Sequence, residues 1–71
     1  MTFARWAAEQ RGRDDKYGDV ARDLVLDPGF STRMSYAQVR EHVEKQSPLP
    51  IVLVLLEQMK EMWQRRRTAP A

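Results

Sequence analysis

Cysteine is absent from the 71-residue chain, so neither a disulfide bond nor a zinc–thiolate centre can stabilise it. A strong excess of one charge is also missing, because 12 Lys and Arg residues stand against 10 Asp and Glu residues, a net charge of +2. This balance does not by itself require a polyanionic partner. At this length a single hydrophobic core is close to marginal, so we expect one small domain built from closely packed helices.

Long apolar runs are lacking as well. The longest run, LPIVLVLL at residues 49–56, has eight residues and contains a proline. A membrane-spanning helix needs about 20 apolar residues. The first ten residues, MTFARWAAEQ, also lack the charged leader and apolar stretch of a secretory signal. We therefore expect a cytoplasmic protein with no membrane association.

Helical periodicity is what the sequence does contain. Apolar residues recur every three or four positions, which predicts helices over about 3–11, from residue 15 to the DPGF turn at 27–30, from residue 35 to the QSPLP break at 46–50, and over about 51–67. The predicted fold class is all-α: a compact four-helix bundle, or five helices with a short extra turn, that has a long C-terminal helix. Residues 1–68 are predicted to form the single domain and residues 69–71 a short disordered tail.

Three residues are predicted to cap these helices. Asp15 can accept hydrogen bonds from the free N–H groups of the second helix, where a negative charge also favours the positive helix end. Ser35 followed by Gln38 is the spacing of a capping box at the start of the third helix. Thr2 is a candidate cap for the first helix, and Gly12 is expected to end it.

The predicted inward faces leave two apolar residues unassigned. On helical wheels the inward faces comprise Tyr17, Val20, Ala21, Leu24 and Val25 in the second helix and Ile51, Val52, Leu55, Leu56, Met59, Met62 and Trp63 in the fourth. Leu53 and Val54 instead fall among charged residues on the opposite side of the fourth helix. Either other helices cover both sides of this helix near its start, or the two residues form an exposed contact for a protein partner.

Four aspartates, Asp15, Asp19, Asp23 and Asp27, recur every fourth residue and could line one helical face. Carboxylates of this kind can bind Mg²⁺ or Ca²⁺, but this face lies opposite the apolar arc and should point into water. The only histidine, His42, is expected to be an ordinary surface residue. We therefore predict no metal, no cofactor, no catalytic residue and no small-molecule substrate, and hence no enzyme.

Basic residues gather near the C-terminus, where Arg65, Arg66 and Arg67 follow Lys60. Cations at the end of a helix complement its dipole, which is sufficient to explain such a cluster in a soluble protein. The alternative is that these four side chains bind the phosphates of a nucleic acid.

The order of several features resembles the YozE-like, or sterile-alpha-motif-like, family of small bacterial and phage helical domains. The similarity rests on Phe3, Trp6, Arg13, Asp14, Asp15, Gly18, Asp19, Val20, Ala21, Asp23, Asp27, Phe30, Ser35, Tyr36, Val39, Val43 and Trp63. It implies a compact four- or five-helix domain and says little about activity, because folds of this kind bind proteins, nucleic acids or themselves.

These observations predict a non-catalytic helical interaction module. Its expected partner is another protein or a second copy, bound through the C-terminal helix at Leu53 and Val54. The alternative is a nucleic-acid-binding domain that uses the C-terminal arginines.

Overall fold

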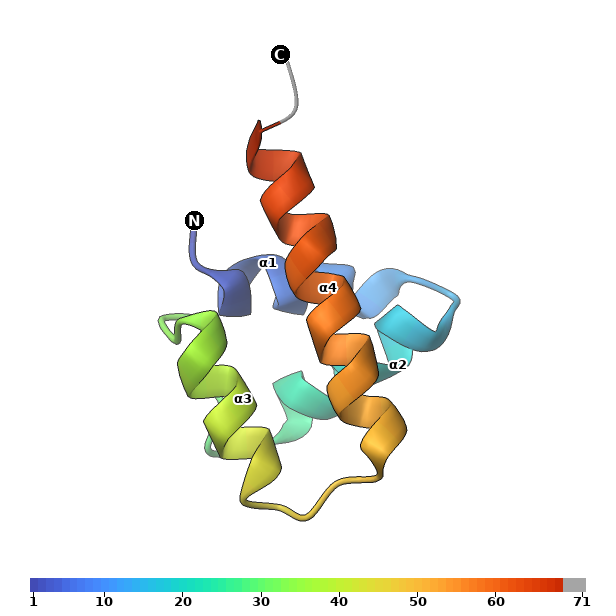
Figure 1. Cartoon of the computed structure of the whole chain (residues 1–71), viewed down its shortest axis with the longest axis vertical. Helices are drawn as coiled ribbons and strands as arrows, with labels where there is room; N and C mark the ends of the chain where they lie inside the picture. Colours follow the sequence, from blue (N-terminus) through green and yellow to red (C-terminus); the bar gives the residue numbers. More distant parts are fainter. Residues whose placement is uncertain (69–71) are drawn as a thin grey trace.

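Residues 1–68 are described by the structure, a computed structural model, and they form only helices and connecting segments (Figure 1). The expected tail at 69–71 lies outside the described residues. The helices are α1 (Phe3–Glu9), the short 3₁₀ helix η1 (Gln10–Gly12), α2 (Lys16–Leu26), α3 (Tyr36–Glu44) and α4 (Pro50–Thr68). The predicted all-α bundle with a long C-terminal helix is therefore confirmed, and η1 is the short extra turn.

The hydrophobic core lies where α4 crosses the other three α-helices, each of which contacts it. Phe3 of α1 is completely buried and occupies the middle of an aromatic group. Its ring meets the rings of Tyr36 and Trp63 edge-on, with centroids 5.0 and 5.8 Å apart. Around it pack the other large buried side chains, chiefly Trp6, Leu24, Val39, Leu55, Leu56 and Met59.

The predicted caps are all present. The Asp15 carboxylate accepts hydrogen bonds from the backbone N–H groups of Tyr17 and Gly18, at 3.1 and 3.0 Å. The hydroxyl of Ser35 accepts from the Gln38 N–H while the Gln38 side chain accepts from the Ser35 N–H, which completes the capping box. Because these bonds satisfy N–H groups that have no partner within the helix, they fix where α2 and α3 begin.

The junction between α1 and α2 depends on a close approach at Gly18. A Cβ atom at this buried position would collide with the backbone carbonyl of Arg13. The same junction is closed by Arg22, whose guanidinium donates hydrogen bonds to the carbonyl oxygens of Arg11 and Arg13 at 2.7 and 3.0 Å. The charged stretch at residues 11–23 is thus a tight helix–helix connection.

Two predicted core residues lie at the surface instead. Val25 is 42% exposed and Ile51 is 55% exposed. Each lies in a terminal turn, Val25 at the end of α2 and Ile51 at the start of α4. The adjacent Leu24 and Val52 do pack in or against the core, so burial changes between neighbouring residues within these terminal turns.

Candidate functional site

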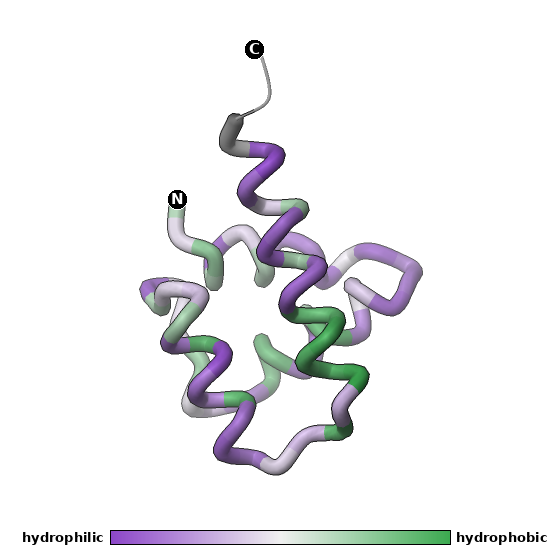
Figure 2. Tube along the Cα trace, in the orientation of Figure 1, coloured by the Kyte–Doolittle hydropathy of each residue, from purple (hydrophilic) through white to green (hydrophobic). Residues whose placement is uncertain are grey.

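Exposed apolar side chains cluster where α4 begins. Leu49, Ile51 and Val54 are 72%, 55% and 49% exposed, and they come from six consecutive residues at one end of the molecule. Figure 2 shows the first turns of α4 as mainly hydrophobic and its later turns as mainly hydrophilic. We call Leu49, Ile51, Leu53 and Val54 the α4 apolar surface.

The two residues of the predicted contact differ in burial. Leu53 is half-buried and packs against the core, as expected if other helices cover both sides of α4. Val54 keeps about half of its surface in solvent, as expected for an exposed contact. Both line a shallow hollow with Arg40 of α3 and Glu57 of α4. The two predicted contact residues therefore differ: Leu53 is the more buried residue of the hollow and Val54 the more exposed one.

A polar network borders this hollow and joins α3 to α4. Glu57 accepts a hydrogen bond from the Tyr36 hydroxyl at 2.8 Å and forms an ion pair with Lys60 at 2.8 Å. Arg40 donates to the Tyr36 oxygen at 3.2 Å and lies 3.4 Å from Glu57. The Lys60 ammonium and the Tyr36 hydroxyl hold the pKa of Glu57 below its usual value, whereas burial and Glu57 raise the pKa of Tyr36. The network keeps the border of the hollow charged and fixed in place.

Lys60 is partnered within the domain. Its ammonium pairs with Glu57 and lies 5.0 Å from the centre of the Tyr36 ring, and the side chain is only 28% exposed. Arg65 and Arg66 are exposed on the last turns of α4. Arg67 belongs to the same helix, but its side chain lies outside the part of the chain that the structure describes. Of the predicted phosphate contacts with described side chains, Arg65 and Arg66 are more exposed than Lys60.

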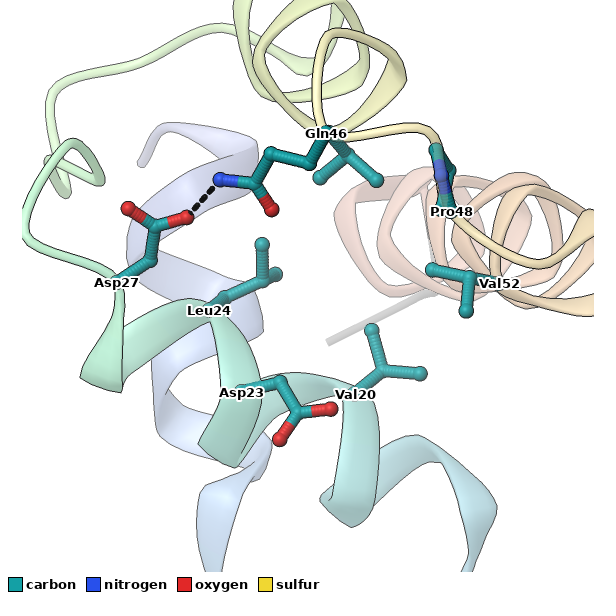
Figure 3. Close-up of a pocket in the computed structure, with 8 residues that line it drawn as sticks. Val20, Asp23, Leu24, Asp27, Gln46, Pro48 and Val52 are labelled. Carbon is teal, nitrogen blue, oxygen red and sulfur yellow. Dashed lines mark hydrogen bonds between the residues drawn. The ribbon is translucent and has the colours of Figure 1, made fainter.

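A second cavity, of about 210 Å³, lies on the other side of the start of α4. Figure 3 shows apolar side chains from α2 and α4 directed toward it and carboxylates at its rim. Its lining includes Val20, Leu24, Val43, Pro48 and Val52, with Asp23 and Asp27 among the polar residues. Neighbouring residues of the segment at 48–54 thus line two different hollows, Pro48 and Val52 in one and Leu53 and Val54 in the other.

Asp27 is not directed into water as predicted. Its side chain is 17% exposed and contacts His42 Nε2 at 3.0 Å, and it also accepts hydrogen bonds from the Gln46 amide and from the Gly29 N–H (Figure 3). Hydrogen bonds from Gln46, Gly29 and His42 hold the pKa of this carboxyl below its usual value. Asp27 therefore ties the end of α2 to α3.

His42 is correspondingly part of a tertiary contact, and its prediction as an ordinary surface histidine is wrong. The ring is separated from Asp27 by 15 positions in sequence, so neither helical spacing nor composition signals the pairing.

The remaining members of the aspartate series, Asp15, Asp19 and Asp23, are exposed as predicted. Within the described residues, no three His, Asp or Glu side chains are grouped so that they could hold a metal ion.

Comparison with models of known protein families, with curated proteins and with solved structures found no match. Nor does any helix within residues 1–68 have the length and hydrophobicity required to cross a bilayer.

Proposed function

We propose that this protein is a non-catalytic helical interaction module that associates with a second copy of itself through the α4 apolar surface. The observation that carries the proposal is the concentration of exposed apolar side chains at Leu49, Ile51 and Val54. Apolar groups exposed together on a small domain are typical of a surface that another protein covers. The resemblance to the YozE-like family is compatible with such a role, and membership of that family stays a prediction.

A second copy is the partner that the shape of this surface favours. A two-fold dimer uses the same patch on both subunits, so the patch must be complementary to itself. Here Leu49 and Ile51 are exposed outside two hollows, one lined by Leu53 and Val54 and the other by Val52. Each copy can therefore offer both the exposed groups and the depressions that receive them.

The size of the surface predicts a weak dimer. A stable interface of standard size covers about 800 Å² on each partner. This area is about one-sixth of the 4859 Å² accessible surface of the chain. The four side chains of the α4 apolar surface provide less than that. We therefore expect association that depends on concentration.

Sedimentation equilibrium over a range of protein concentrations tests the proposal. The wild type should show a rising average mass, and Val54→Glu should remain monomeric because it places a charge in the centre of the surface. Val25→Glu is the matched control, since Val25 is exposed to a similar degree at the end of α2 and lines neither hollow. It should associate like the wild type.

Circular dichroism and thermal melting of each variant separate a loss of association from a loss of fold. Leu53→Glu is expected to lower the melting temperature, because Leu53 packs against the core, whereas Val54→Glu should leave it nearly unchanged. A wild type that stays monomeric at every concentration would contradict self-association. A Val54→Glu variant that still dimerises would show that another surface is used.

A further inference from the structure

A basic hollow lies at the end of the molecule away from the α4 apolar surface. It is lined by Met1, Thr2, Arg5, Thr32 and Arg33, which come from the start of α1 and from the segment before α3. Figure 1 shows these two parts of the chain close together, beyond the N-terminal end of α3. The Thr2 hydroxyl donates a hydrogen bond to the Thr32 carbonyl, and the Ala4 N–H donates to the Met34 carbonyl at 3.4 Å. These bonds hold the two segments in register.

Two arginines line this hollow, and a third contacts another of its lining residues. Arg5 and Arg33 are exposed and both line it. Arg66 of α4 lies against it, because its Nη1 atom is 3.6 Å from the sulfur of Met1. We call Arg5, Arg33 and Arg66 the arginine end.

The arginine end differs in its electrostatics from the surfaces around Arg13, Arg22 and Arg40. Each of those three arginines forms an ion pair with an aspartate or glutamate. Among the described residues, no such ion pair involves Arg5, Arg33 or Arg66, and no acidic side chain lines the hollow. Within the described part of the chain, these three positive charges therefore have no paired carboxylate, although the net charge of the chain is only +2.

We propose that the arginine end binds the phosphate backbone of a nucleic acid. A guanidinium group matches the oxygens of a phosphate with a pair of parallel hydrogen bonds. Arg5 and Arg33 line a shallow hollow and Arg66 contacts Met1 at its edge, so the three arginines are spread over a surface and do not converge in a deep pocket. This arrangement suits successive phosphates of a polymer better than the single phosphate of a modified peptide.

A lipid surface fits the arginine end less well. Membrane-binding surfaces combine basic groups with apolar side chains that enter the interface. Of the large exposed apolar residues, only Met1 lies in this hollow, whereas Leu49, Ile51 and Val54 lie at the other end of α4. The basic and apolar surfaces are therefore separated. This binding also uses a different surface from the proposed self-association, since the two surfaces share no residue.

Fluorescence anisotropy with a short labelled DNA duplex of arbitrary sequence tests the proposal. The duplex is titrated with the full chain at several salt concentrations. If each arginine neutralises one phosphate, the logarithm of the association constant should fall with the logarithm of salt with a slope of about −2.7. Replacing one arginine by glutamine should reduce the steepness of that slope by about 0.9. If the wild type and a single variant have equal affinity at about 1 M salt, this change in slope makes the variant bind about fifteenfold more weakly at about 50 mM salt.

The variants are Arg5→Gln, Arg33→Gln and Arg66→Gln, alone and combined. Lys45→Gln is the matched control, because it removes one exposed positive charge at the far end of α3. Arg33→Lys keeps the charge and should bind within a few-fold of the wild type. The combined variant should show neither measurable affinity nor salt dependence while its circular dichroism spectrum is unchanged.

Three results would overturn the proposal. The first is no binding of DNA at low salt, and the second is unchanged affinity in the combined variant. The third is an equal loss in Lys45→Gln, which would mean that general charge is responsible and not this surface. Binding of anionic lipid vesicles without binding of DNA would likewise assign the arginine end to membranes and refute the nucleic-acid assignment. Because the monomeric Val54→Glu variant can be tested in the same titration, a failure of either proposal is distinguishable from a failure of the other.

Discussion

Substitution of Gly18 by alanine is a sensitive test of how α1 and α2 are joined. Alanine is the better helix former, and in a helix interior the exchange normally stabilises by about 1 kcal/mol. In this structure, however, the added Cβ atom collides with the carbonyl carbon and oxygen of Arg13. Backbone atoms cannot turn aside as a side chain can, so α2 must move away from the preceding turn.

The expected loss follows from these opposing effects. Overpacking of a buried site costs about 1–3 kcal/mol, and a collision with backbone belongs at the upper end of that range. After subtraction of the gain in helix propensity, Gly18→Ala should lower the free energy of unfolding by about 2 kcal/mol. For a domain of this size, that corresponds to a melting temperature lower by about 8–16 °C.

Gly12 supplies the matched control, because no atom lies within 4 Å of a Cβ built there and its φ angle is not positive. Gly12→Ala should therefore stabilise the protein by about 0.4–1 kcal/mol, because alanine lowers the conformational entropy of the unfolded chain. Thermal melting followed by circular dichroism measures both variants. A Gly18→Ala protein that melts at or above the wild-type temperature would refute the close approach of α2 to Arg13.

Three further predictions concern the caps and networks. Ser35→Ala removes the acceptor of the Gln38 N–H and should cost about 1 kcal/mol, measured by urea unfolding. Tyr36→Phe removes the hydrogen bond to Glu57 and should cost about 0.5–1.5 kcal/mol in the same assay, with the α3–α4 packing retained. The pKa of Asp27 lies below its usual 3.8, so its ionised form stabilises the fold above that pH, and this contribution is lost as the pH falls further. The melting temperature should therefore decrease as the pH falls below about 4, and should decrease less in Asp27→Asn.

The fold could be predicted from the sequence wherever short-range interactions determine it. The caps at Asp15 and Ser35 involve partners within three residues, so spacing alone identifies them. The apolar residues 51–56 are likewise assigned to a helix by their neighbours, because helix-forming residues follow without a break and α4 continues to Thr68.

The candidate site was less accessible to sequence reasoning, because it depends on where helices end in space. A helical wheel assigns Ile51 to the inward face, but this side chain is 55% exposed although the adjacent Val52 packs against the core. Leu53 lies on the outward side of the wheel and yet packs against the core. The pairing of Asp27 with His42 and the grouping of Arg5, Arg33 and Arg66 join segments far apart in sequence, and no local pattern signals either contact.

The length of α4 has a consequence for how the two surfaces act together. Its 19 residues make a rod of about 28 Å, with the apolar surface on its first turns and Arg66 near its far end. A dimer joined through the first turns would direct its two arginine ends outward, on opposite sides. Such a dimer would be bivalent and would bridge two separate stretches of nucleic acid. Bridging would then increase steeply with protein concentration, because each weak contact strengthens the other through a high effective concentration.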